Sequence, residues 1–144
     1  MKKRHSSFIV MSEDLNHHRT LFVGKATMWL METGFMTTAM YKKPEEVVCF
    51  AVNMSKFLKP VPSGAIIDYT GQVAHVGKSS VTVYIYGKTF DSDDICIEGL
   101  VTYITIDKTT RKKVAHGIVM DEPADEEEVK MRQRALKFLS NSNA

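Results

Sequence analysis

The chain has 144 residues, of which 44% are hydrophobic and 25% are charged. This length corresponds to about one domain of ordinary globular composition, which excludes a disordered tail, a collagen-like chain and a two-domain enzyme. The formal net charge of +2 is too balanced to predict a nucleic-acid partner. No apolar run approaches the ~20 residues of a membrane span, so no membrane partner is predicted either.

Both cysteines, Cys49 and Cys96, lie in apolar runs typical of strands rather than in a metal-ligand spacing. We therefore expect neither a disulfide framework nor a zinc site, and this use of cysteine is typical of a cytoplasmic protein. The basic residues 1–5 are followed by no long apolar region, so they do not predict a targeting segment.

The first part of the chain predicts a strand, a loop and a helix. The apolar run 8–11 predicts a short strand, and the polar run 12–20 predicts a loop. Residues 24–41 contain no proline and show helical periodicity, and this helix must end before Pro44. Five apolar side chains share one side of it: Met28, Met31, Phe35, Met36 and Ala39. The pattern predicts a largely buried helix.

After this helix the pattern changes to the two-residue period and the apolar runs of β-strands. Four strands are predicted, over 47–57, 65–76, 80–86 and 95–106. In the third, apolar residues alternate with amphipathic ones, which predicts an antiparallel sheet with one covered face. The apolar set is Val81, Val83 and Ile85, and the other set is Thr82, Tyr84 and Tyr86. A sheet that follows one buried helix is best closed by wrapping around it, so an α+β fold is expected.

The end of the chain predicts a second helix over 124–139, because acidic residues precede basic ones in the order that complements a helix dipole. Its apolar stripe is narrow and consists of Met131, Ala135, Phe138 and Leu139. Such a helix is expected to lie on a surface or to dock against a neighbouring subunit. We expect a main domain over 1–120, with the helix and tail over 121–144.

Glu32 is the most informative polar residue, because helical spacing places it inside the apolar stripe between Met28 and Met36. Burying a carboxylate is costly unless it is paired, hydrogen-bonded or protonated, and a carboxyl whose pKa is raised by burial suits a general base. The plainer alternative is a carboxylate that bonds a core hydroxyl or backbone group, or that reaches water at an interface.

Gly24 stands near the start of the predicted helix, where free backbone N–H groups and the positive end of the dipole can approach an oxyanion. A simple turn or cap glycine is the alternative. Just upstream, Asn16 can orient a water or polarise a carbonyl, and His17 or His18 can act as acid or base. The histidine and cysteine spacings do not predict a metal site.

Two polar turns are candidates for contacts with an anion. Lys78, Ser79 and Ser80 follow Gly77 in a predicted hairpin turn, for which either a plain turn or a phosphate or pantetheine contact is open. The basic run 111–113 fits either a solvated turn or a contact with an anionic nucleotide.

Four ordered motifs resemble those of the acyl-CoA thioesterases of the hotdog fold, over about residues 8–118. They are Asn-His-His-x-Thr-Leu-Phe-x-Gly-Lys from Asn16, Trp-x-Met-Glu from Trp29, Lys-Phe-Leu-Lys-Pro-Val from Lys56, and Val-Gly-Lys-Ser-Ser-Val from Val76. The resemblance implies a sheet wrapped around one long helix and a dimer whose sheets join edge to edge. It also implies, commonly, a hexamer built as a trimer of dimers.

The same resemblance implies active sites at the dimer interface, with the loop asparagine and a helix carboxylate supplied by different subunits. Acyl-CoA is the implied substrate, and no separate cofactor is needed. The Gly24 N–H would polarise the thioester carbonyl, Asn16 would position the water or the carbonyl, and Glu32 would act as general base. Lys78, Ser79 and Ser80 would contact coenzyme A.

The chain departs from the family pattern at three positions. Members usually show Asn-x-x-Gly, Phe-Gly-Gly and Trp-Met-Asp-Glu, whereas here Arg19 and Val23 replace two glycines and Met31 replaces the aspartate. Glu32 matches the acidic residue after that aspartate, 100° further round the helix. The absent aspartate predicts weakened hydrolysis unless Glu32 takes over its role. The alternative is a non-catalytic module that binds acyl-CoA or an acyl carrier.

Overall fold

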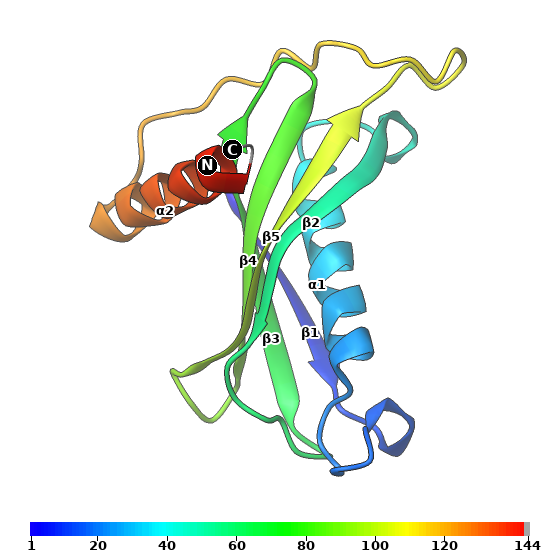
Figure 1. Cartoon of the computed structure of the whole chain (residues 1–144), viewed down its shortest axis with the longest axis vertical. Coiled ribbons are helices and arrows are strands. Elements are labelled where there is room, and N and C mark those ends of the chain that lie inside the picture. Colours follow the sequence, from blue (N-terminus) through cyan, green and yellow to red (C-terminus); the bar gives the residue numbers. More distant parts are fainter. Residues whose placement is uncertain (143–144) are drawn as a thin grey trace.

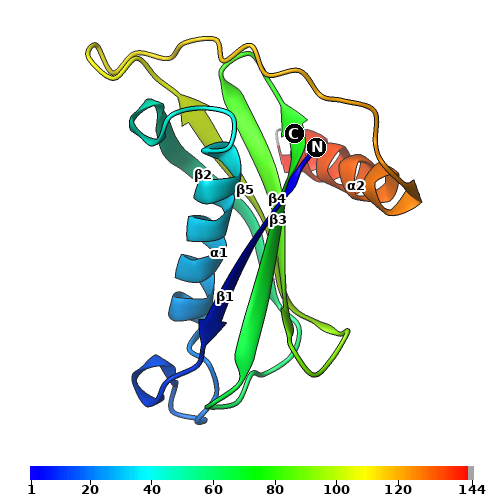
Figure 2. The same ribbon diagram turned by 180° about the vertical axis from the view of Figure 1, so that it is seen from behind.

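The computed structural model describes residues 1–142 and consists of one five-stranded sheet with a helix on each face (Figures 1 and 2). The elements are β1 (Lys3–Ile9), α1 (Val23–Thr38), β2 (Val47–Phe57), β3 (Ile66–Val76), β4 (Ser80–Thr89), β5 (Ile95–Thr105) and α2 (Glu126–Ser142). Short 3-10 turns cover Ser12–Asp14 and Pro44–Glu46. The strand order is β1-β3-β4-β5-β2, and every neighbouring pair is antiparallel. The predicted α+β arrangement is confirmed.

The predicted strands 47–57, 65–76 and 95–106 agree with β2, β3 and β5 to within one residue at each end, and β4 runs three residues beyond the predicted 80–86. A first strand is present as predicted, but its predicted bounds of 8–11 are wrong, because β1 occupies Lys3–Ile9. Its residues pair with β3 from Lys3 opposite Gln72 to Ile9 opposite Ile66. An edge strand exposes much of its surface, so polar residues suffice to form it and leave no apolar signal.

Both helices were correctly predicted in type, and their bounds differ by a few residues. The first runs over Val23–Thr38 rather than 24–41, and the second over Glu126–Ser142 rather than 124–139. Residues 143–144 of the expected tail lie outside the described part of the chain. Within residues 1–142, no helix is both long enough and apolar enough to cross a membrane.

The core lies between α1 and the inner face of the sheet. The alternation predicted for β4 is confirmed, since Val81, Val83 and Ile85 are fully buried. Two buried tyrosines of the sheet hold the helix. Tyr69 donates a hydrogen bond of 2.8 Å to the carbonyl of Ala26, and Tyr103 donates one of 2.5 Å to the carbonyl of Met31.

The buried face of α1 is not the predicted methionine stripe, and Met28 is 40% exposed. The buried residues are Ala26, Trp29, Leu30, Thr33, Gly34, Thr37 and Thr38. Each of the three threonines donates its hydroxyl to the backbone carbonyl four residues earlier, over 2.7–3.2 Å. A threonine that satisfies its hydroxyl in this way can be buried like a small apolar residue, and periodicity counted on apolar residues misses it.

Helix α2 covers part of the outer face of the sheet (Figure 1), so the prediction of a sheet with one covered face is wrong for that part. Met131 and Ala135 of α2 are buried against Ala74 and Leu100 of the sheet. The helix therefore docks on its own chain, along the narrow stripe that the sequence indicated.

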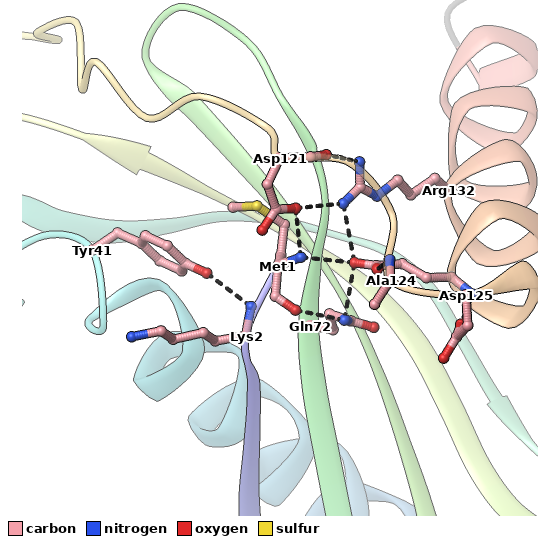
Figure 3. Close-up of polar contacts among 9 residues, drawn as sticks. Met1, Lys2, Tyr41, Gln72, Asp121, Ala124, Asp125 and Arg132 are labelled. Atoms are coloured by element: carbon pink, nitrogen blue, oxygen red, sulfur yellow. Dashed lines mark hydrogen bonds and ion pairs between the residues drawn. The ribbon is translucent and has the colours of Figure 1, made fainter.

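A polar cluster joins the start of β1 to α2 (Figure 3). The Met1 amino group donates to Asp121 at 2.7 Å and to Glu128 at 2.8 Å, and Arg132 donates to the same two carboxylates. Gln72 donates to Glu128 at 3.0 Å. Burial disfavours the charged forms of the Met1 amine and of Glu128, but the hydrogen bonds between charged partners outweigh this effect of burial. They raise the pKa of the Met1 amine and lower the pKa of Glu128.

Glu128→Gln is expected to lower the free energy of unfolding by roughly 3 kcal/mol at pH 7, because it removes the buried one of the two carboxylates that neutralise the Met1 amine and Arg132. Since the pKa of Glu128 is lowered from 4.5 by folding, the wild-type advantage is present above that pH and disappears as the pH falls through the folded-state value. Urea unfolding at pH 7 and pH 3 measures both effects. Glu127→Gln, an exposed neighbour, is the control and should change stability by less than about 0.5 kcal/mol. An equal loss of unfolding free energy in the two variants would contradict the stabilising role of the polar cluster.

The loop before α1 contains a strained residue. Arg19 has a φ of 61°, the left-handed region that favours glycine. The departure from the family's Asn-x-x-Gly pattern therefore places an arginine where the backbone conformation suits the glycine.

Arg19→Gly is expected to stabilise the protein by about 1 kcal/mol, because the left-handed conformation costs an L residue roughly 1–2 kcal/mol and the chain entropy of glycine offsets a part. His18→Gly is the matched control. His18 has no positive φ. His18→Gly therefore relieves no strain, adds conformational entropy to the unfolded chain only, and should destabilise the folded protein. Thermal unfolding of the two variants compares them, and a Tm lowered in both would refute the strain.

Candidate active site

The loop before α1 is closed by the side chain of Asn16. Its oxygen accepts from the backbone N–H of His18 at 2.9 Å and of Thr20 at 3.2 Å, and its amide group donates to the Thr20 hydroxyl at 3.1 Å. The backbone N–H of Asn16 donates to the carbonyl of Thr20 at 2.8 Å. An amide carries two N–H donors, so one donor of this half-buried side chain stays available for a substrate.

The first turn of α1 leaves Gly24 with an open backbone N–H. Phe22 caps the helix in an extended conformation, and its carbonyl accepts the N–H of Ala26 at 3.0 Å. Gly24, at the second helical position, has no carbonyl within the helix for its N–H, and the helix dipole places positive potential there. A Cβ on Gly24 would collide with the ring of Phe22, so only glycine allows this close packing beside the amide.

A buried carboxylate that the sequence prediction missed supports this loop. Asp14 accepts the N–H of Met11 at 2.9 Å, and its other oxygen lies 3.6 Å from the ammonium nitrogen of Lys25. Its backbone carbonyl accepts the N–H of Phe22 at 2.8 Å. Asp14 thus fixes the approach of the chain to the helix, and in the sequence it could not be told from the solvated acidic residues of a polar loop.

Asn16 borders two hollows. The inner one has a volume of about 180 Å³ and is mostly apolar. It is lined by Asn16, Thr20, Leu21, Val23, Ala26, residues 57–61, Ile67, Cys96 and Ile97. The outer one is open and is bounded by Leu15, Asn16, His17, Phe22 and Val23. A polar amide and a helix N-terminus therefore meet at the mouth of an apolar cavity.

The prediction that Glu32 is buried in an apolar stripe is wrong, because its side chain is exposed on the outer side of α1. The buried side is occupied by the threonines and small residues described above. Glu32 follows Gly24 by eight residues, or about 12 Å along the helix axis. It therefore cannot reach the Gly24 amide of its own chain. Met31 is half-buried and packs against the core.

The predicted coenzyme A contacts lie at the other end of the subunit. Lys78, Ser79 and Ser80 form the turn between β3 and β4, at the top of Figure 1, whereas α1 begins at the bottom. The turn is fixed by segment 105–116. Backbone N–H groups of that segment donate to Lys78 at 3.2 Å and to Ser79 at 2.8 Å, and the His116 ring contacts the Ser80 carbonyl at 3.0 Å.

The exposed basic run 111–113 lies at this same end. One chain thus places Asn16 on a cavity that the first turn of α1 also lines, through Val23 and Ala26, but Glu32 and the Lys78 turn lie away from it. His17 and His18 are exposed with their rings 4.0 Å apart. Within residues 1–142 no three His, Cys, Asp or Glu side chains gather as metal ligands.

Residues 18–96 match the Thioesterase superfamily, which covers more than half of the chain. No curated protein matches it. Among solved structures, the chain resembles the acyl-CoA hydrolase of Staphylococcus aureus in complex with butyryl coenzyme A, coenzyme A and coenzyme A disulfide. The two are 24% identical with a TM-score of 0.84, over 98% of this chain and 84% of that one.

Two further structures are similar. The acyl-CoA hydrolase of Bacillus cereus is 22% identical with a TM-score of 0.83, over 96% of this chain and 84% of that one. A hexameric hotdog-fold thioesterase of Campylobacter jejuni is 23% identical with a TM-score of 0.69, over 89% and 94%. These likenesses confirm the fold that the motifs predicted. With a helix wrapped by an antiparallel sheet and a family match over residues 18–96, the chain belongs to the thioesterase superfamily and has the hotdog fold.

Proposed function

We propose that the chain is an acyl-CoA thioesterase, which hydrolyses the thioester of acyl-CoA to a free fatty acid and coenzyme A. One observation carries the proposal: Asn16 and Val23, the first residue of α1, line the same apolar cavity of about 180 Å³, so this polar amide and the helix N-terminus, with the open N–H of Gly24 one residue further on, border one cavity. Membership of the superfamily supports it, as does the likeness to hydrolases, one of which was solved with butyryl coenzyme A.

The chemistry requires a site for the negative charge that develops on the carbonyl oxygen when water attacks the thioester. The Gly24 N–H and the positive end of α1 supply such a site without reorganisation. The free donor of Asn16 can orient the carbonyl or the water. Collapse of the tetrahedral intermediate then breaks the carbon–sulfur bond and releases the coenzyme A thiolate.

Activation of the water needs a base, and we assign this role to Glu32 of a second copy of the chain. The separation of about 12 Å along the helix excludes Glu32 of the same copy. The Glu32 side chain is exposed on the outer side of α1, which leaves the carboxylate accessible to a neighbouring subunit. The site is thus completed only in an oligomer.

The same argument applies to coenzyme A. Lys78, Ser79 and Ser80 lie at the opposite end of the subunit from Gly24, so we propose that a second copy supplies them. Lysine makes charge-assisted contacts with phosphate, and the neighbouring run 111–113 adds positive charge. We retain the proposal of a dimer assembled into a trimer of dimers, with acyl-CoA as the substrate and no separate cofactor.

The chain is expected to be an oligomer at micromolar concentration. Strand β2 is a long, unpaired sheet edge, on which Phe50 is 66% exposed and Val52 41% exposed. Three structures that resemble the chain are of hexameric thioesterases. Light scattering coupled to size exclusion measures the mass, and a monomer would remove the basis of a site shared between subunits.

Release of free thiol from a panel of acyl-CoAs tests the proposed reaction. Glu32→Gln should reduce turnover by roughly 10²–10⁴-fold, as expected for the loss of a general base, while KM is largely kept because the carboxylate acts in the transition state. Glu45→Gln, an exposed carboxylate outside the site, is the control and should leave the rate unchanged.

If the native chain is slow or inactive, Met31→Asp distinguishes an enzyme that lacks its aspartate from a non-catalytic binding module. A slow native chain that gains activity in this variant would show that the missing aspartate limits the reaction and that Glu32 has not replaced it. Tight binding of acyl-CoA without any thiol release would instead indicate a non-catalytic binding module. Robust activity that survives Glu32→Gln would overturn the assignment of the base and direct attention to His17 and His18.

A further inference from the structure

A separate cavity lies between α2 and the outer face of the sheet, on the side opposite to α1, and has a volume of about 240 Å³. Strands β2, β4 and β5 contribute one wall, and α2 contributes the other. Its floor is apolar and consists of Met54, Leu100, Met131, Ala135 and Phe138. Pockets for drug-sized ligands measure roughly 300–1,000 Å³, so this one suits a smaller molecule with a single short chain.

The rim of this cavity is cationic, with Lys56 on β2 and Arg134 and Lys137 on α2. Arg134 is held in place by the buried carboxylate of Glu98, whose oxygens lie 3.3 and 3.4 Å from the guanidinium, and by the ring of Tyr84, 5.8 Å away. Tyr84 donates its own hydroxyl to Glu98 at 2.6 Å. These contacts use one nitrogen of the guanidinium, so further N–H donors remain on a side chain that is 59% exposed.

The charges at the rim do not balance. In the part of the chain that the structure describes, no residue that lines the cavity is acidic, and Glu98 is already paired with Arg134. Among residues 1–142, neither Lys56 nor Lys137 makes an ion pair. Two cations that make no ion pair with residues 1–142, above an apolar floor, are complementary to a ligand that has an anionic head and an apolar tail.

We propose that this cavity binds the anion of a short- or medium-chain fatty acid. The alkyl chain lies on the apolar floor, and the carboxylate meets Lys56, Lys137 and the guanidinium of Arg134. The site lies on the other face of the sheet from Gly24 and uses no residue of the proposed active site. It therefore does not rest on the proposed hydrolysis, although a fatty acid is also the product class of that reaction.

Calorimetric titration of the full chain with octanoate tests this site. Binding is expected in the wild type and should weaken at high ionic strength. Replacing both lysines, Lys56→Gln with Lys137→Gln, should weaken it at least tenfold. The matched control removes two other exposed lysines that do not line the cavity, Lys43→Gln with Lys130→Gln, and should bind as the wild type does.

Two comparisons make the test specific. The neutral analogue 1-octanol should bind at least tenfold more weakly than octanoate, and Ala135→Phe, which fills the cavity, should abolish octanoate binding. Absence of octanoate binding to the wild type, equal affinity for 1-octanol, or binding unchanged in the Lys56 and Lys137 variant would each overturn the proposal. Thiol release from acyl-CoA, measured on the same preparations without octanoate, reports the proposed hydrolysis separately.

Discussion

The close contact between α1 and the sheet is the constraint on which the rest of the structure depends. A Cβ on Gly34 would collide with the Tyr103 hydroxyl, and one on Gly71 would collide with the hydroxyl of Thr37. Small residues on both surfaces therefore bring helix and sheet together, and the hydrogen bonds from Tyr69 and Tyr103 to helix carbonyls fix the helix along its length. This placement determines where the first turn of α1, and with it the Gly24 amide, is held.

Much of the fold could be predicted from the sequence, because strand alternation and turn residues are local signals. The bounds of β2, β3 and β5 follow from them almost to the residue. Two features could not be predicted. The polar residues of β1 become a strand only by pairing with β3, and the buried face of α1 depends on threonines whose hydroxyls bond within the helix. Both depend on partners that a local pattern does not contain.

The candidate site could likewise be predicted only where it depends on local signals. Asn16 and Gly24 lie eight residues apart in the chain, and a single loop closed by hydrogen bonds places Asn16 on the cavity that the start of α1 also lines. The position of Glu32 depended on which face of α1 is buried, so the error about the threonines became an error about the carboxylate. The Lys78 turn lies at the far end of the sheet, and no pattern within one chain could have indicated its distance from Gly24.

The irregular pairing of β2 has a consequence for how the protein avoids aggregation. Its register with β5 shifts twice, between Cys49 and Ala51 and between Val52 and Met54. A flat edge strand with exposed apolar residues is a template for open-ended addition of further strands, as in fibrils. Bulges bend and twist the strand locally, so an incoming strand must match that shape to pair along the whole edge. The edge can therefore remain open to one specific partner while it resists indiscriminate growth.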